Sequence, residues 1–198
     1  MSFTAIFGGT FNPIHIGHYE ILQALENDDE ITEIFLMPDN VPPHKVCDFL
    51  ADDDTRIEMC RITGKDFKKV KLCLIEFERS GKSYTYDTVA LLKERYPHKD
   101  FALVCGGDML VTFDKWYRYE ELGRLVTIIA FRRSDTDNTL FDSKVKEFME
   151  KGFNIKVMEK TITSVSSSEI RSDFKKAKKL LPERIYDFLN ERGVYGGE

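Results

Sequence analysis

The sequence predicts an α/β fold: a doubly wound, mostly parallel sheet with helices on both faces and a small helical part at the C-terminus. Short β-branched or aromatic segments alternate with amphipathic segments along the whole chain. Several of the short segments are apolar on both faces, as in strands that lie between two layers of helices. The 198 residues contain no internal repeat or Gly/Ser-rich linker, so a single domain over residues 1–198 is expected.

The strands are expected where β-branched and aromatic residues cluster. Alternation of strands with helices implies right-handed crossovers, which bring the loops after the strands to one edge of the sheet. In such folds the ligand binds at that edge, where the winding reverses. The predicted strands are residues 4–7, 33–37, 72–76, 101–105, 126–130 and 155–158.

Helices are expected between these strands, several of them with a start or stop signal. Thr55 and Glu58 form a capping-box pattern that predicts a helix to about residue 63, with Gly64 in the C′ position. Val145, Phe148 and Met149 share one helical face, closed by Gly152. Residues 170–181 have helical apolar spacing, and Pro182 suits the first turn of a final helix that ends at Gly193. Two more helices are expected around Leu22 and Leu25 and around Val89 and Leu92.

Composition and charge exclude several classes of protein. The net charge of −5 provides no basic surface for nucleic acid, so a polyanionic ligand has to be held locally. No apolar run approaches the roughly 20 residues that span a bilayer, which excludes membrane insertion. The N-terminus lacks a secretory pattern, so a cytoplasmic location is expected. The four cysteines have neither disulfide-framework nor zinc-site spacing and are expected to be reduced.

The loop after the first predicted strand is the most informative segment. Residues 8–18 read Gly-Gly-Thr-Phe-Asn-Pro-Ile-His-Ile-Gly-His and lead into a helix. Gly8 and Gly9 lack Cβ atoms where the backbone turns, so that N–H groups can face an oxyanion. His15 and His18 lie at the helix start, where free N–H groups and the helix dipole favour a phosphate. Capping or surface histidines are the alternative, but the combination of residues favours a phosphate-binding turn.

A serine cluster near the C-terminus is the second candidate phosphate site. Residues 164–171 read Ser-Val-Ser-Ser-Ser-Glu-Ile-Arg at a predicted helix start. Serine is a favoured N-cap, and simple capping is the alternative interpretation. Capping needs only one serine, whereas this cluster supplies several hydroxyls, and Arg171 adds a guanidinium fork. We therefore expect Ser167, Ser168 and Arg171 to contact phosphates.

Three further loops narrow the substrate. Residues 39–45 hold paired prolines followed by His44 and Lys45, which offer positive charge to a substrate phosphate; a rigid turn is the alternative. Residues 83–88 begin a helix whose N–H groups can receive a carboxylate, and capping with space-filling tyrosines is the alternative. Trp116, the only tryptophan, offers a flat face on which an aromatic acid can stack, unless it is a core or surface residue.

Together these motifs resemble, in order and spacing, those of the bacterial nicotinate-nucleotide adenylyltransferases, a family in the nucleotidyltransferase superfamily built around H-x-G-H. The resemblance runs from residue 3 to residue 195. Ser168 replaces a threonine of the last motif, and Asn12 stands where many members carry Asp. The resemblance implies a Rossmann-like enzyme of NAD biosynthesis that transfers the adenylyl group of ATP to nicotinate mononucleotide and releases pyrophosphate.

The resemblance also implies roles for particular residues. Mg²⁺ is expected to accompany ATP, and no residue is assigned as a metal ligand. His15, His18 and Arg171 are expected to serve catalysis. The ATP-binding residues implied are Gly8, Gly9, Thr10, Phe11, His15, His18, Gly106, Asp108, Ser167, Ser168 and Arg171, and the substrate-binding residues are Asn40, His44, Lys45, Tyr84, Thr85 and Trp116.

Two alternatives stay open at this point. The acceptor can be nicotinamide mononucleotide or another phosphorylated small molecule such as phosphopantetheine. A nucleotide-binding regulatory module without turnover is the rival from another class, and both histidines and Arg171 argue against it. The oligomeric state is open as well, a homo-oligomer included.

Overall fold

The computed structural model describes residues 2–40, 49–79, 81, 83–134 and 137–196. Its strands form a six-stranded sheet with the order β3-β2-β1-β4-β5-β6, and every pairing in it is parallel. The doubly wound α/β prediction is therefore confirmed. The strands are β1 (Phe3–Gly9), β2 (Ile31–Pro38), β3 (Val70–Leu72), β4 (Phe101–Gly106), β5 (Thr127–Phe131) and β6 (Asn154–Val157).

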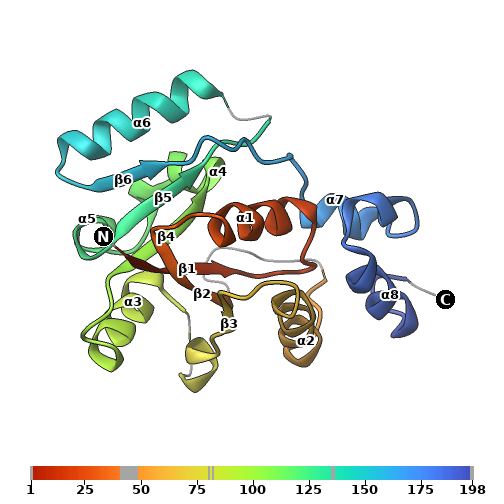
Figure 1. The fold of residues 1–198 in the computed structure, drawn as a ribbon. Coiled ribbons are helices and arrows are strands. Elements are labelled where there is room, and N and C mark those ends of the chain that lie inside the picture. Colours follow the sequence, from red (N-terminus) through yellow and green to blue (C-terminus); the bar gives the residue numbers. More distant parts are fainter. Residues whose placement is uncertain (1, 41–48, 80, 82, 135–136, 197–198) are drawn as a thin grey trace.

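Helices cover both faces of this sheet, and the last two lie beyond one end of it (Figure 1). In the described part of the chain, no helix has the length and apolar character needed to cross a membrane. The α-helices are α1 (Ile16–Glu26), α2 (Asp53–Gly64), α3 (Thr85–Arg95), α4 (Gly107–Val111), α5 (Tyr119–Leu125), α6 (Asn138–Glu150), α7 (Ser167–Ser172) and α8 (Glu183–Glu191). Short 3₁₀ helices are η1 (Ile75–Glu78), η2 (Phe113–Lys115) and η3 (Lys176–Leu180).

Alternate residues of the central strands are buried on opposite faces of the sheet. In β1, Ala5 and Phe7 belong to the core cluster on the side of α1 and α2, whereas Ile6 belongs to the cluster on the side of α3, α4, α5 and α6. In β4, Val104 joins the first cluster and Leu103 the second. Two buried faces explain why these strands are apolar at successive positions. The two helix layers therefore lie on opposite sides of the β1–β4 pair.

The third strand is shorter and lies earlier than residues 72–76. Cys73 N–H still donates to the Leu36 carbonyl at 3.0 Å, but Leu74 leaves the extended region with φ −105° and ψ 20°. Ile75 and Glu76 then belong to η1 and are buried. Only the first residue of the predicted segment 72–76 lies in a strand, and its last two begin a 3₁₀ turn at the edge of the sheet, so this strand prediction is wrong over most of its length.

Two helix boundaries differ from the predicted ones. Helix α2 begins earlier because Asp52, not Thr55, is its N-cap; the Asp52 carboxylate accepts from Thr55 N–H at 2.6 Å. Gly64 is the last helical residue and not a C′ glycine. Gly152 and Gly193 do end α6 and α8 in left-handed conformations, with φ of 86° and 63°.

The C-terminal apolar pattern is not one continuous helix. Residues 170–181 are divided between α7 and η3 because Asp173, at φ −152° and ψ 76°, interrupts the helix. The Asp173 carboxylate then accepts from Lys176 N–H at 3.3 Å and restarts the turn. Ile170, Phe174, Ala177 and Leu181 are nevertheless all buried. On α6, Met149 is exposed, and Phe141 and Phe148 are the buried side chains of that helix.

The short helices α4 and α5, which were not predicted, lie between β4 and β5. They lack a sustained helical repeat and are held by packing, with Leu110, Phe113 and Leu122 completely buried. Gly123 in α5 lies against the Phe153 ring, where a Cβ would come within 2.6 Å of a ring carbon. Close approach of the helix to this ring requires glycine.

Gly123→Ala is expected to lower the free energy of unfolding by about 1–3 kcal/mol, because the buried Phe153 ring has to move. Gly64→Ala is the matched control, since its Cβ would meet one side-chain methyl group of Val70 at 3.3 Å. The control is expected to stay within about 1 kcal/mol of the wild type. Urea denaturation measures both, and equal stabilities of the two variants would contradict the packing argument.

Three cysteines, Cys60, Cys73 and Cys105, are free thiols, as expected for reduced cysteines. Cys47 lies outside the described residues. Burial raises the pKa of Cys105 to about 12 and also raises the pKa of Cys60 and Cys73. Thiols with raised pKa values hold little reactive thiolate at neutral pH. These cysteines are therefore packing residues.

Candidate active site

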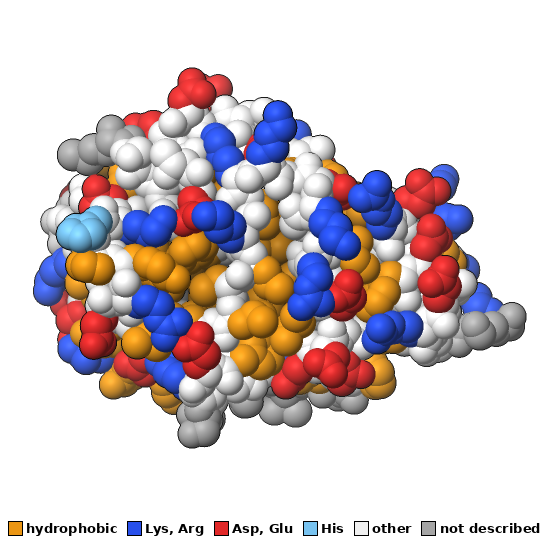
Figure 2. Space-filling model, turned by 60° about the horizontal axis from the view of Figure 1, so that its bottom comes forward, with side chains coloured by type: hydrophobic (Ala, Val, Ile, Leu, Met, Phe, Trp, Pro, Cys, Tyr) orange, Lys and Arg blue, Asp and Glu red, His pale blue; other side chains and the backbone are white. Residues whose placement is uncertain are grey.

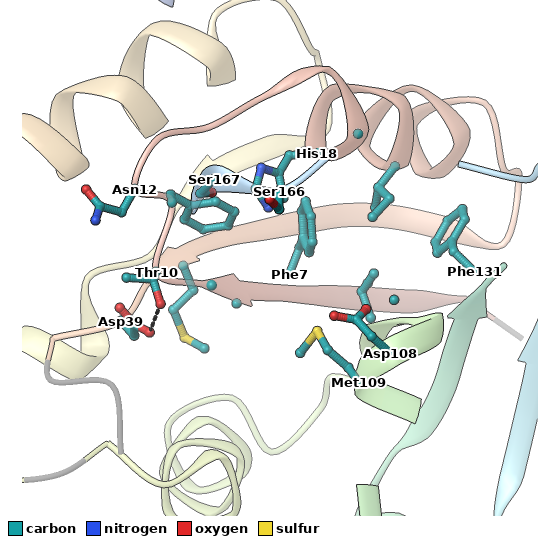
Figure 3. A pocket seen from close by; sticks show the side chains of 18 of the residues that line it. Phe7, Thr10, Asn12, His18, Asp39, Asp108, Met109, Phe131, Ser166 and Ser167 are labelled. Carbon is teal, nitrogen blue, oxygen red and sulfur yellow. Dashed lines mark hydrogen bonds between the residues drawn. The ribbon is translucent and has the colours of Figure 1, made fainter. Parts of the chain in front are cut away.

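A cavity of about 720 Å³ opens at the carboxyl ends of β1 and β4. The connections from these neighbouring strands run to opposite faces of the sheet, so the chain leaves a crevice between them. One face of the molecule is hollowed, with hydrophobic side chains on the floor of the hollow (Figure 2). His18, Ser166 and Ser167 border the cavity on one side, and Asp108 and Met109 border it on another (Figure 3).

The turn after β1 forms part of the cavity wall. Gly8, Gly9, Thr10 and Phe11 all line it. Phe11 has a left-handed conformation, with φ of 47°, which a side chain rarely adopts without surrounding contacts. The Thr10 hydroxyl donates to the Asp39 carboxylate at 2.9 Å, which ties the turn to the loop after β2 (Figure 3). Neighbouring loops thus hold the turn in place.

The two histidines lie together at the start of α1. Their rings stack with centroids 3.7 Å apart and planes 24° apart. The backbone N–H of His15 donates to His18 Nδ1 at 3.2 Å. His18 Nε2 is therefore the ring atom able to donate to a ligand. Both residues line the cavity. Gly17, in the first turn of α1, also lines the cavity, and a Cβ there would meet the Thr163 carbonyl oxygen at 3.0 Å.

The serine cluster does more than cap α7. Ser166 accepts from Glu169 N–H at 3.1 Å and is the N-cap. Ser167 donates to the Pro13 carbonyl at 3.0 Å, and Ser168 accepts from Arg171 Nη2 at 3.1 Å. Arg171 Nη1 donates to the Asn12 carbonyl at 2.7 Å. Capping of α7 and contact with the N-terminal turn are therefore both present, on different serines.

The opposite wall holds the aromatic side chains. Tyr84 is the N-cap of α3, and Thr85 is its first residue, so free helix N–H groups lie at the cavity edge. Trp116 also lines the cavity, half-buried, and its ring packs against Phe113 with centroids 5.2 Å apart. Tyr117 packs against Tyr84 with centroids 4.7 Å apart. A flat apolar face and free N–H donors therefore occur on the same wall.

The end of β4 forms a third part of the site. Gly106 is the N-cap of α4, and Asp108, in its first turn, projects its carboxylate into the cavity mouth. Arg133 Nη1 lies 3.3 Å from Asp108 Oδ1, and Arg133 Nη2 donates to the Val165 carbonyl at 2.9 Å. Arg133 therefore connects this wall to the segment before α7.

The loop after β2 is where the predicted and observed positions diverge. Asn40 does not line the cavity; its amide donates to the Arg79 carbonyl at 3.2 Å and, at 3.5 Å, to that of Glu76. Its contact is thus with the segment at η1 and not with the cavity. His44 and Lys45 lie outside the described residues.

Comparison with known proteins agrees with this geometry. The cytidylyltransferase-like family model matches residues 6–173. The nicotinate-nucleotide adenylyltransferase of Bacillus subtilis is 36% identical over 197 residues, covering 96% of each chain, and a probable one of Listeria welshimeri is 31% identical over 191 residues with the same coverage.

The chain belongs to the nicotinate-nucleotide adenylyltransferase family. It is therefore an enzyme of the nucleotidyltransferase class. A solved structure of Plasmodium falciparum nicotinic acid mononucleotide adenylyltransferase complexed with NaAD has the same fold, with a TM-score of 0.83, 22% identity and coverage of 100% of this chain and 99% of that one. The same enzyme complexed with APC gives a TM-score of 0.81 with the same identity and coverage.

Arg56 is a buried residue beside the site that was not predicted from the sequence. Its side chain is completely buried, and Nη1 donates to the Thr10 carbonyl at 3.2 Å and the Asp39 carbonyl at 2.7 Å. Nη2 donates to the Asn40 carbonyl at 3.3 Å and to the Asp53 carboxylate. One guanidinium thus joins the loops after β1 and β2. Nothing in the local pattern of α2 distinguishes this arginine from a surface residue. Arg133 could have been found, because it lies in the loop two residues after the end of β5.

Glu76 is the second missed residue, a buried carboxyl group in the cavity wall. Thr88 Oγ1 donates to Glu76 Oε1 at 2.9 Å, and Arg79 Nη2 lies 2.6 Å from the same hydroxyl. Burial raises the pKa of Glu76 above the ordinary value of 4.5, the nearby Asp39 charge acts in the same direction, and the Thr88 hydrogen bond opposes both. The folded protein therefore holds this proton to a higher pH than the unfolded chain does.

Glu76→Gln is expected to change how stability depends on pH. Above pH 4.5 the unfolded wild type releases the Glu76 proton before the folded protein does, so its free energy of unfolding falls as the pH rises toward the folded pKa. The variant lacks this loss and gains stability relative to the wild type as the pH rises. Urea denaturation from about pH 5 to pH 8 measures the difference.

Glu78→Gln is the matched control from the same 3₁₀ helix. Glu78 is exposed, and its hydrogen bond from Arg95 lowers its pKa, so its removal cannot produce a relative gain at higher pH. A Glu76→Gln variant whose stability stays parallel to that of the wild type would contradict the raised pKa.

Among the described residues, no group of three His, Cys, Asp or Glu side chains could hold a metal ion. Cations and hydroxyls are prominent among the polar side chains that line the cavity, and both suit phosphate oxygens. Arg133, Arg171 and Lys115 line the cavity together with the carboxylates of Asp39 and Asp108. The arrangement can therefore bind a polyanion beside a flat aromatic ring.

Proposed function

We propose that the protein transfers the adenylyl group of ATP to nicotinate mononucleotide, forming nicotinate adenine dinucleotide and pyrophosphate. One observation carries the proposal: a single cavity contains both the His15, His18 and Arg171 cluster and the Thr85 and Trp116 wall. The names of its curated relatives support the same acceptor. The structures of the Plasmodium falciparum enzyme with NaAD and APC support the substrate pair.

The triphosphate is proposed to bind between the two ends of the chain. His18 Nε2 and the Arg171 guanidinium donate to phosphate oxygens, and the start of α1 contributes free N–H groups. Hydroxyls of the serine cluster complete this half of the site. Gly106, at the end of β4, and Asp108, in the first turn of α4, are proposed to meet the adenosine ribose. The residues proposed to contact ATP are Gly8, Gly9, Thr10, Phe11, His15, His18, Gly106, Asp108, Ser167, Ser168 and Arg171.

The acceptor is proposed to bind against the aromatic wall. The pyridine ring stacks on Trp116, and its carboxylate lies at the free N–H groups of α3 beside Tyr84 and Thr85. Asn40, His44 and Lys45 remain proposed contacts of the substrate phosphate. Asn40 would reach the substrate only if its hydrogen bonds to the η1 segment were exchanged.

The reaction requires alignment and charge stabilisation but no strong general base. A phosphate oxygen of the acceptor attacks the α-phosphorus of ATP, and the bond from that phosphorus to the bridging oxygen breaks to release pyrophosphate. A phosphate at neutral pH is already an anionic nucleophile, so the main barrier is the approach of two anions. His18 and Arg171 offset it by donating to oxygens on which charge develops. Mg²⁺ enters as the MgATP substrate, since it prefers phosphate oxygens and water.

We also propose that residues 1–198 are one nucleotidyltransferase domain. The family model covers residues 6–173, and the Plasmodium falciparum structure covers the whole chain. A cytoplasmic location belongs to the same proposal, because the reaction consumes ATP.

An acceptor assay tests the proposed function. Purified protein with ATP and Mg²⁺ is given nicotinate mononucleotide, nicotinamide mononucleotide or phosphopantetheine, and pyrophosphate release is followed. The nicotinate nucleotide is expected to give the highest kcat/KM. A higher kcat/KM with nicotinamide mononucleotide would identify that nucleotide as the acceptor. Release of pyrophosphate with phosphopantetheine alone would contradict binding of a pyridine nucleotide.

His18→Ala is expected to lower kcat by about 100-fold or more and to raise either KM only a few-fold, because His18 donates to charge that develops in the transition state. His98→Ala, at an exposed position away from the cavity, is the control and is expected to behave as wild type. Steady-state kinetics with both substrates measure the effect. Weaker substrate binding with unchanged turnover would assign His18 to ground-state binding.

Trp116→Ala is expected to raise the KM for the acceptor about tenfold while leaving the KM for ATP within about twofold, because stacking on the pyridine ring is lost. Trp116→Phe keeps a flat ring and is expected to retain most of the acceptor affinity. An equal loss for ATP and acceptor in the alanine variant would show that Trp116 supports the cavity wall and not the pyridine ring.

A further inference from the structure

The end of the chain returns to the turn that follows β1. The Tyr195 hydroxyl donates to Asn12 Oδ1 across a separation of 183 residues. Tyr195 adopts a left-handed backbone conformation with φ of 60°, which a tyrosine holds only when its contacts compensate the strain. Asn12 is 2% exposed and lines the cavity. The C-terminal segment therefore reaches the cavity wall through one buried amide.

Both the oxygen and the nitrogen of the Asn12 side-chain amide make hydrogen bonds. Its Oδ1 atom also accepts from Ala51 N–H at 3.1 Å, and its Nδ2 atom donates to the Phe49 carbonyl at 2.8 Å. An amide meets these requirements because it combines an acceptor for two donors with a donor for one carbonyl. An aspartate lacks the donor and would place a charge against the Phe49 carbonyl.

The Asn12 backbone makes the contact with the phosphate-binding side chains. Its carbonyl accepts from Arg171 Nη1 at 2.7 Å, and the next carbonyl, that of Pro13, accepts from Ser167 at 3.0 Å. These bonds set the direction of the guanidinium, whose planar fork permits little freedom once one edge is held. The position of Asn12 therefore determines the position of Arg171.

The Tyr195 ring supports the same region from outside. It packs against Phe49 with centroids 5.5 Å apart, and against Phe174 with centroids 6.1 Å apart. Phe174 is buried and follows α7, the helix that carries Arg171. Tyr195 is not among the residues that line the cavity, so any effect on the substrate passes through its neighbours.

We propose that Tyr195 is a positioning residue for the triphosphate half of the site. Its hydroxyl holds the Asn12 side chain, and the Asn12 carbonyl holds the Arg171 guanidinium toward the phosphates. The identity of the ligand, a triphosphate, rests on the proposed adenylyl transfer. The coupling of Tyr195 to Arg171 rests on the hydrogen bonds that both residues donate to Asn12.

Tyr195→Phe tests the proposal, because it removes the hydroxyl and keeps the ring that packs on Phe49 and Phe174. We expect kcat/KM for ATP to fall about five- to tenfold and the KM for nicotinate mononucleotide to stay within about twofold. Affinity for the non-hydrolysable analogue α,β-methylene-ATP is expected to weaken, while the thermal midpoint stays near that of the wild type.

Tyr19→Phe is the matched control. It removes one tyrosine hydroxyl that donates to Asp66 at 3.1 Å, on the outer side of α1 and away from the cavity. We expect this variant to match the wild type in all kinetic constants. If Tyr195→Phe also matches it, or lowers only the thermal midpoint, the proposed positioning role is wrong.

A double-mutant cycle tests whether the effect passes through Asn12. In an Asn12→Ala background the Tyr195 hydroxyl has lost its acceptor, so Tyr195→Phe is expected to have no further effect on kcat/KM for ATP. Additive effects would overturn the coupling. If Asn12→Ala does not fold, the single Tyr195→Phe variant, compared with Tyr19→Phe, still decides the proposal.

The two proposals fail in different ways. Absence of pyrophosphate release by the wild type with every acceptor would contradict adenylyl transfer. A wild type that is active, with a Tyr195→Phe variant that binds α,β-methylene-ATP and turns over like Tyr19→Phe, would contradict only the role of Tyr195.

Discussion

The crevice between β1 and β4 is the constraint on which the rest of the structure depends. These strands are neighbours in a parallel sheet, and the chain leaves them toward opposite faces, so their loops cannot close over the carboxyl edge. Every candidate site segment then enters the cavity from a strand end or a helix start. The chemistry of the site follows from what these ends offer, namely free N–H groups and short, stiff turns.

Buried charges hold the loops at this edge in register. Arg56 is completely buried, yet its guanidinium has five oxygen partners on the loops after β1 and β2 and on α2. Burying a charge with this many partners costs less free energy than burying an isolated charge. Removing one of the charged partners would destabilise the fold, because it would leave the guanidinium charge partly uncompensated. The Asp108 and Arg133 pair links the β4 end to the segment before α7. Charge pairs thus connect different loops at the edge of the cavity.

The C-terminal helices complete a site that begins at the N-terminus. Arg171 and Ser167 donate to the carbonyls of two successive residues in the turn after β1. The Tyr195 hydroxyl donates to the side chain of the first of these residues, Asn12. Hydrogen bonds to charged groups are the stronger kind, so the guanidinium bond is the main tie between the two chain ends. This closure explains why residues more than 150 positions apart form one binding surface, as the 159-residue separation of Arg171 from Asn12 shows.

Local pattern alone determined the doubly wound fold, most strand positions, the glycine and histidine turn and the serine and arginine motif, because each has a signal within a few residues. The tertiary structure decided the rest. Asp173 breaks a pattern that reads as one helix, α4 and α5 exist because of packing, and Asn40 turns toward η1. Arg56, Glu76 and Asn12 owe their roles to partners far away in sequence, such as the Tyr195 hydroxyl. Periodicity records which face is buried, whereas a polar contact between distant segments leaves no periodic trace in the chain.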